Sequence, residues 1–252
     1  ISIELPDSVT SMGANPFVGC EFLKNIRVSQ EQPAFAVIDG VLFNKAEKAL
    51  ICYPGGKQAE VYKVPQGIQQ IGDFAFESCS SLTSIELPDG VMSIGNFAFR
   101  YCSSLTSIEL SDSVTRIGDC AFLECSSLKN IKLPDSVTSV GDGAFGGCSS
   151  LTSIELPDSV MKIGDNVFGG CSSLTSIELP DSVTSIGDYA FSGCSSLTNI
   201  ELPDSVTSIG TRVFSFCDNL TLTVQRDSYA AQYAKDNGLN YTYPDANDWL
   251  NN

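Results

Sequence analysis

The chain contains 252 residues, of which 42% are hydrophobic, and its formal net charge at pH 7 is −16. The hydrophobic content is sufficient for a continuous core, so a disordered chain is disfavoured, and the apolar runs are too short to span a membrane. An acidic surface repels phosphate groups and anionic lipids, which disfavours nucleic-acid and polybasic membrane roles. The acidity either keeps the protein soluble or attracts cationic partners.

The N-terminal residues already form part of a repeat. The segment from Ile3 to Val9 reads Ile-Glu-Leu-Pro-Asp-Ser-Val, a motif that recurs throughout the chain. We therefore expect the natural N-terminus, with any signal peptide, to lie upstream of residue 1.

Residues 29–60 depart from this motif and predict an irregular repeat elaborated by hairpins. Asp39-Gly40 stands between two apolar runs, which is a strong signal for a β-hairpin turn. A second turn is expected within residues 44–48, and a pair of glycines is expected to turn the chain back into a strand within residues 60–64. Four lysines make this part of the chain less acidic than the rest: Lys45, Lys48, Lys57 and Lys63.

The chain repeats with a period of 23 residues between about Ile71 and Cys217. Seven phenylalanines mark the period, and each is followed three positions later by a cysteine; they are Phe76, Phe99, Phe122, Phe145, Phe168, Phe191 and Phe214. A unit this short cannot enclose a hydrophobic core alone, so successive units must stack on one another. Because parallel strands joined by crossovers are nearly always right-handed, we predict a right-handed solenoid with one coil per unit.

One unit, taken as residues 174–194, predicts the elements of a coil. Ile177 alternates with polar neighbours, which is the pattern of a short half-buried strand, and the following proline ends the strand because it lacks an N–H donor. A second brief strand is expected just before Gly187, which allows a close backbone approach. Asp188 is expected to cap a single helical turn that carries Phe191.

Stacking in register places equivalent residues of successive coils on top of one another. One leucine, one isoleucine and one phenylalanine per coil are predicted to form buried spines, and each buried side chain is expected to contribute about 1.5–3 kcal/mol.

The ten cysteines divide into two groups. Cys52 and Cys120 lie outside the repeated rows and are the candidates for a reactive thiol. The other eight cysteines are predicted to form a buried ladder of free thiols, slightly too far apart for disulfides: Cys20, Cys79, Cys102, Cys125, Cys148, Cys171, Cys194 and Cys217.

The C-terminal part of the chain predicts a cap for the solenoid, which needs a terminal unit with a polar outer face. An alternating strand at residues 220–224 is followed by a helix that we expect Asp227 to cap and Gly238 to end. The expected division is a solenoid over residues 1–220, a β-α-β cap over 221–243 and a loosely attached tail over 244–252 that includes Trp249.

The coil motif resembles that of a known family. A leucine at the strand start, an isoleucine, Leu-Pro and then Ile-Gly-x-x-Ala-Phe-x-x-Cys resemble the BspA-like leucine-rich repeats, also called the Treponema pallidum type, over residues 1–20 and 61–220. Ser111 and Thr211 depart from the motif without threatening the fold. The resemblance implies a bacterial surface or secreted protein that adheres to host extracellular-matrix proteins or to other cells. The family motif is structural, so it carries over no functional residue.

The residue that follows the inward isoleucine of each strand is expected to point outward, onto the concave strand surface that solenoids use for binding. Three of these residues are consecutive glutamates, whose mutual repulsion a cationic partner would relieve. The alternative is that the positions are polar only for solubility. The candidate binding ladder consists of Arg27, Lys63, Glu86, Glu109, Lys132, Glu155, Glu178 and Glu201, with Glu4 at its start.

Other residue patterns give less support for a site. The chain has no histidine, which excludes a Ser-His-Asp triad, a Cys-His pair and His-containing zinc sites. A row of aspartates could attract calcium, but each has an adequate turn role: Asp89, Asp112, Asp135, Asp158, Asp181 and Asp204. We therefore expect no metal, no cofactor and no catalytic residue.

The patterns predict a non-enzymatic, monomeric leucine-rich-repeat solenoid, and the resemblance implies that it lies at the cell surface or outside the cell. Protein ligands, such as host matrix or cell-surface proteins, are the expected partners, with neither nucleic-acid binding nor membrane insertion. The first alternative is a structural spacer that projects other domains. A carbohydrate-active enzyme with a pair of carboxylates is a weaker alternative.

Overall fold

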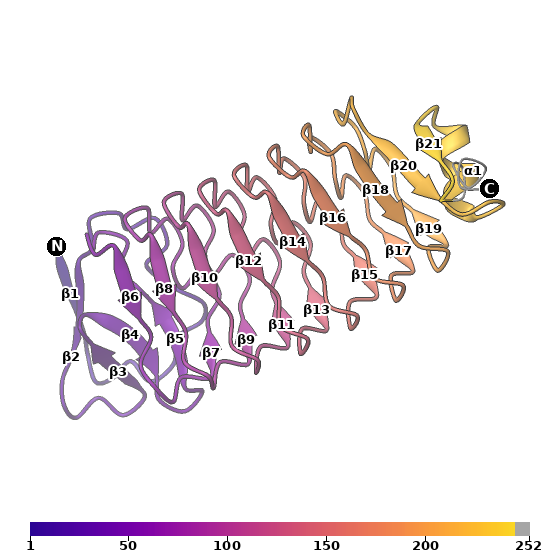
Figure 1. The fold of residues 1–252 in the computed structure, drawn as a ribbon. Helices are drawn as coiled ribbons and strands as arrows, with labels where there is room; N and C mark the ends of the chain where they lie inside the picture. Colours follow the sequence, from indigo (N-terminus) through magenta and orange to yellow (C-terminus); the bar gives the residue numbers. More distant parts are fainter. Residues whose placement is uncertain (245–252) are drawn as a thin grey trace.

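The computed structural model describes residues 1–244, which form an elongated stack of coils (Figure 1). About ten coils of about 23 residues follow one another from one end of the stack to the other, with β1 and β21 at opposite ends. The predicted solenoid is confirmed. Residues 245–252, which hold nearly all of the expected tail and Trp249, lie outside the described residues.

Six successive coils each contribute one short strand to a first sheet, in which neighbouring strands pair in parallel. The isoleucine of the strand faces the core and its two neighbours face outward, as the alternation predicted. The six strands of this sheet are β6 (Val61–Lys63), β8 (Ser84–Glu86), β10 (Ser107–Glu109), β12 (Asn130–Lys132), β14 (Ser153–Glu155) and β16 (Ser176–Glu178).

Separate small sheets stand at the two ends of the first sheet. At the N-terminal end, β1 (Ser2–Leu5) pairs with β2 (Asn25–Val28). At the C-terminal end, β18 (Asn199–Leu202), β20 (Thr221–Val224) and β21 (Asn240–Thr242) form a three-stranded parallel sheet.

The predicted second strand of each coil is also present, and it is only two residues long. These strands line up in parallel as a second sheet. The sheet is interrupted between β13 and β15, which form no registered pair within the described chain. They are β7 (Gln70–Ile71), β9 (Ser93–Ile94), β11 (Arg116–Ile117) and β13 (Ser139–Val140), followed by β15 (Lys162–Ile163), β17 (Ser185–Ile186) and β19 (Ser208–Ile209).

The seven phenylalanines form one continuous stack through the core. Ring centroids of successive coils lie 5.0–5.8 Å apart with interplanar angles of 5–17°. The first six rings are fully buried, and Phe214 at the end of the stack is 6% exposed. The leucine and isoleucine spines are buried beside them, as predicted, so the coils share one core rather than enclosing separate ones.

The third side of each coil is a turn, and here the prediction of a helical turn is wrong. The residue two positions before the stacked phenylalanine has a positive φ in every regular coil, for example +56° at Tyr189 and +52° at Cys120, which is incompatible with a right-handed helical turn. The backbone N–H groups instead bond to the next coil, as in the 3.1 Å bond from Phe191 N to Val213 O. The turn side is therefore a third ladder of hydrogen bonds between coils.

The aspartate expected to cap that helical turn binds the neighbouring coil instead. Asp188 Oδ1 accepts a hydrogen bond of 2.7 Å from the backbone N–H of Thr211, 23 residues further on, and equivalent bonds of 2.7–3.1 Å join the preceding coils. Gly187 allows this approach, because a Cβ there would lie 2.7 Å from the backbone nitrogen of Asp165. The Gly-Asp pair thus ties each coil to the next.

The irregular N-terminal segment folds as two hairpins, as predicted. β3 (Phe35–Ile38) and β4 (Val41–Asn44) are joined by Asp39-Gly40, where both residues have positive φ, and β4 pairs in turn with β5 (Ala49–Cys52). β5 then pairs in parallel with β7, which links the hairpins to the second sheet. This segment and the first coils form a separate small core around Phe35 and Leu42.

The C-terminal residues fold as a strand, a helix and a strand, and the residue that caps the helix differs from the one predicted. The helix α1 (Tyr229–Asp236) begins after Ser228, whose hydroxyl accepts a hydrogen bond from Ala231 N, whereas Asp227 has a φ of +59° and lies outside the helix. Gly238 follows the helix end with a φ of +64°, in agreement with its predicted role. Ala230 and Ala234 are buried against the solenoid, while Tyr229 is 46% exposed.

Candidate interaction surface

The charged ladder lies where the strand alternation placed it, on the outer side of the first sheet. Its members from Lys63 to Glu178 occupy the same register position on six adjacent strands. Glu201 continues the ladder on β18, which belongs to the next sheet, and Arg27 lies on β2 opposite Glu4. The structure therefore brings six of the eight candidate residues into one registered ladder and leaves one at each end in a separate sheet.

Opposite charges in the ladder neutralise one another at one position only. Lys63 Nζ lies 3.0 Å from Glu86 Oε2, and because the two side chains are 70% and 57% exposed, this ion pair adds little stability. Lys132 lies in register between Glu109 and Glu155 and forms no ion pair with any residue from 1 to 244. The cation of this coil is therefore available to a partner.

Like charges face one another directly at two places. Glu86 pairs in register with Glu109, and Glu155 pairs in register with Glu178. Carboxylates on adjacent strands repel one another when no cation lies between them. The second pair has no cation within ion-pair distance among the described residues, so this end of the sheet is a region of uncompensated negative charge.

A shallow depression of about 410 Å³ interrupts the ladder over β10 and β12. Its lining includes Glu109 and Lys132 from the ladder, together with Leu110, Asp112 and Pro134 at the strand ends. Sequence reasoning identified the two ladder residues and considered Asp112 only for calcium, and it missed Leu110 and Pro134. The available signal was Ser111, which stands where the other coils have proline and whose hydroxyl donates a 3.2 Å hydrogen bond to Val91 O.

Some lysines of the hairpin segment are less available to a binding partner than their number indicates, because they already bind other groups of the chain. The ammonium groups of Lys45 and Lys57 donate to the backbone carbonyls of Gln32 and Asp39, the latter at 2.7 Å. Their positive charge is thus partly used to hold the hairpins in place. Lys63 belongs to the ladder and is paired with Glu86.

All ten cysteines are free, as predicted, and seven of the eight predicted ladder members are buried. In six coils the Sγ donates to the phenylalanine carbonyl 26 residues earlier, at 3.0–3.2 Å. Burial raises the pKa of Cys102 and Cys148 to about 12, with a smaller opposing effect from hydrogen bonds to the backbone of Cys79 and Cys125. These thiols are packing groups rather than nucleophiles.

The prediction for the remaining thiols is corrected in two respects. Cys20 was assigned to the buried ladder but is exposed, because the irregular segment separates its coil from the regular stack. Cys52, proposed as reactive, is buried, and burial raises its pKa to about 12. Burial also raises the pKa of the partly buried Cys120 thiol, with a further increase from the carboxylate of Asp119. Cys20 is therefore the most accessible thiol of the described chain.

Residues 1–244 contain no group of three or more Cys, Asp or Glu side chains arranged to hold a metal ion. The aspartates considered for calcium follow the ends of the first-sheet strands and are exposed. Within the same range, no helix is long and apolar enough to cross a bilayer.

Comparisons with known proteins agree with this architecture. Residues 1–48, 52–172 and 115–228 match the model of the BspA type leucine rich repeat region, with 6 copies. No curated protein matches the chain significantly. Among solved structures, the T. pallidum leucine rich repeat protein (TpLRR) is similar with a TM-score of 0.68 and 30% identity, over 83% of this chain and 95% of that one.

Two longer proteins share the fold at lower identity. The pneumococcal vaccine antigen PcpA has a TM-score of 0.66 and 24% identity over 96% of this chain, and a leucine-rich repeat protein from Eubacterium ventriosum has 0.63 and 24% over 87%. This chain spans 55% and 53% of their respective lengths, about half of each. None of these three names describes an enzyme. From the motif, the stacked coils and the family match, the chain belongs to the BspA type leucine-rich-repeat family.

Proposed function

We propose that this chain is a protein-binding module of a bacterial surface or secreted protein, and that it holds basic partners on the charged ladder of the first sheet. Solenoids of stacked repeats bind partners along extended surfaces of this kind. The pneumococcal protein of similar fold is named a vaccine antigen, which is in keeping with a surface location. Adhesion to host matrix proteins or to other cells is the specific activity we propose.

The uncompensated carboxylates at the C-terminal half of the ladder are the observation that carries this proposal. Glu155 and Glu178 face one another in register without a cation within ion-pair distance, and Glu201 extends the series on β18. Holding like charges side by side disfavours the folded state slightly. A partner that places Lys or Arg side chains over these strands removes that repulsion and gains charge-assisted hydrogen bonds.

The test compares two variants with the same net charge. The first neutralises the ladder (Glu155→Gln, Glu178→Gln and Glu201→Gln), and the second adds three lysines to the other sheet (Ser139→Lys, Ser185→Lys and Ser208→Lys). Both are assayed with the unmodified chain for binding to a panel of immobilised matrix proteins and glycans at two salt concentrations. We expect the first variant to bind a protein ligand at least about tenfold more weakly, since each lost charged contact costs about 1.5–3 kcal/mol.

The control separates a local site from general electrostatic attraction. Equal losses in the two variants would show that only net charge matters, and undiminished binding by the first variant would remove the ladder as the site. A chain that captures no member of the panel would favour the spacer alternative. Turnover of a glycan would instead favour the enzyme alternative.

A further inference from the structure

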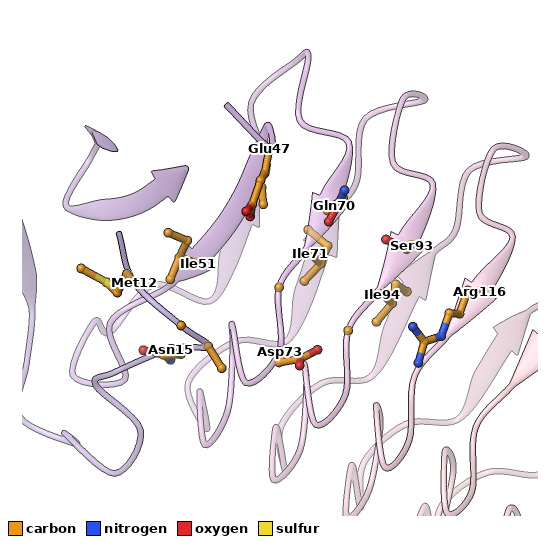
Figure 2. A pocket seen from close by; sticks show the side chains of 15 residues that line it. Met12, Asn15, Glu47, Ile51, Gln70, Ile71, Asp73, Ser93, Ile94 and Arg116 are labelled. Atoms are coloured by element: carbon orange, nitrogen blue, oxygen red, sulfur yellow. The ribbon is translucent and has the colours of Figure 1, made fainter. Parts of the chain in front are cut away.

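A cleft on the second sheet offers a binding site distinct from the charged ladder. Residues 12–15 lie beside the N-terminal end of this sheet and form one wall, while β7 and β9 contribute to the floor (Figure 2). The cleft has a volume of about 340 Å³, which lies within the range of small-ligand sites.

The wall of this cleft is held in place by buried hydrogen bonds. Asn15 is buried, and its side-chain amide donates to Phe74 O at 2.8 Å while its carbonyl oxygen accepts from Phe17 N at 2.9 Å. The backbone N–H of Asn15 also donates to Asp73 O at 3.4 Å. The bonds to Phe74 and Asp73 fix residues 12–15 of the N-terminal repeat against the first regular coil, so the cleft is formed before a ligand arrives.

Opposite charges stand at the two ends of the cleft. Arg116 extends from β11 at one end and Glu47 lies beside β5 at the other, as Figure 2 shows. Neither charged group forms a hydrogen bond or ion pair with the rest of residues 1–244. Between them lie the polar side chains of Gln70 and Ser93 and a second carboxylate, that of Asp73, whose Oδ1 accepts a 2.7 Å hydrogen bond from Asn96 N. Met12 and Ile51 lie on the side of the wall.

The separation of the two ends sets the length of a ligand that would contact both. β5, β7, β9 and β11 pair successively, so three strand spacings of about 4.8 Å separate the first from the last, or about 14 Å in all. An extended peptide covers about 3.3–3.6 Å per residue. A peptide of three or four residues therefore spans the cleft.

We propose that this cleft binds short peptides of three or four residues through both of their free termini. The planar guanidinium of Arg116 matches the two oxygens of a terminal carboxylate, and Glu47 accepts hydrogen bonds from the terminal ammonium group. Gln70 and Ser93 provide donors and acceptors for the peptide backbone, while Met12 and Ile51 contact an apolar side chain. An acidic sugar matches Arg116 equally well, but it leaves Glu47 without a cationic partner.

The methionines provide a specific readout for peptide binding. The chain has three, and Met12 lines the cleft while Met92 and Met161 do not. In a chain with ¹³C-labelled methionine methyl groups, titration with tetra-alanine should shift the Met12 resonance and leave that of Met161 unchanged. The amidated and the N-acetylated peptides should each bind at least about tenfold more weakly, because each lacks one charge-assisted contact.

Lys162 supplies a matched control for Arg116, because it occupies the same position of the repeat on β15 and lies outside the cleft. Arg116→Gln should weaken tetra-alanine binding at least about tenfold, whereas Lys162→Gln should leave it unchanged. The proposal is overturned if the Met12 resonance does not respond at millimolar peptide, or if the two variants behave alike. It is also overturned if glucuronate shifts Met12 as strongly as the peptide does, since the cleft would then be a site for acidic sugars.

Discussion

Removal of one ring from the phenylalanine stack should cost more in its middle than at its end. Phe145 is fully buried between Phe122 and Phe168, with centroid distances of 5.5 and 5.8 Å, whereas Phe214 has one ring neighbour in the stack at 5.7 Å and is 6% exposed. Phe→Ala in a core costs about 3–5 kcal/mol, and an aromatic pair contributes about 0.5–1.5 kcal/mol beyond its buried area. We expect Phe145→Ala to fall near 5 kcal/mol and Phe214→Ala about 1 kcal/mol lower.

Urea unfolding followed by far-ultraviolet circular dichroism provides the measurement. Phe216→Ala is the matched control, because this side chain lies two residues from Phe214, is 77% exposed and has a φ of +63°. Its replacement should change the free energy of unfolding by no more than about 0.5 kcal/mol. An equal or larger loss for Phe214→Ala than for Phe145→Ala would refute the argument that each ring is stabilised by its neighbours in both directions.

Two further predictions concern the ladders between coils. Asp165→Ala removes the acceptor of the 2.8 Å bond from Asp188 N and should cost about 1 kcal/mol, whereas Asp181→Ala, at an exposed turn, should stay within about 0.5 kcal/mol in the same urea assay. Burial raises the thiol pKa of Cys148 from 9.0 to about 12, so above pH 9 the unfolded chain loses a proton that the folded chain keeps. Each such thiol should lower the free energy of unfolding by about 1.4 kcal/mol per pH unit from pH 9 to 12, and an unchanged slope in Cys148→Ala would contradict this.

The core was predictable from the sequence because its positions repeat without exception between residues 71 and 217. A leucine, an isoleucine and a phenylalanine recur at fixed intervals, and a parallel stack is the arrangement that buries all three at once. The hairpins were also predictable, because Asp39-Gly40 favours a turn with two positive φ angles.

The turn side was not predictable in the same way. Asp188 and its equivalents have the residue type of a helix cap, and only the position of the next coil shows that they accept a hydrogen bond 23 residues away. The cap of α1 was ambiguous for a similar reason. Asp227 and Ser228 both have side chains that can cap a helix, and only their backbone conformations show that Ser228 is the cap.

The alternation of residues along the strands was enough to predict the candidate binding ladder, but the sequence did not predict the cleft. Its wall comes from residues 12–15, whose path depends on hydrogen bonds to Phe74 and Asp73 in a coil about 60 residues later in the chain. One signal was present in the sequence: Arg116 occupies a position where the adjacent coils have Ser93 and Ser139.

Departures from the repeat are where a solenoid can distinguish one part of its surface from another. Identical coils present the same side chains at every strand spacing, so a ligand that fits one coil fits the next and gains nothing from a particular register. Lys132 breaks a run of glutamates on the first sheet, and Arg116 stands between Ser93 and Ser139 on the second. Each places a single unpaired cation beside a hollow in the surface. The repeated glutamates of the first sheet can attract a basic partner at any coil, so the register in which that partner binds must depend on such exceptions.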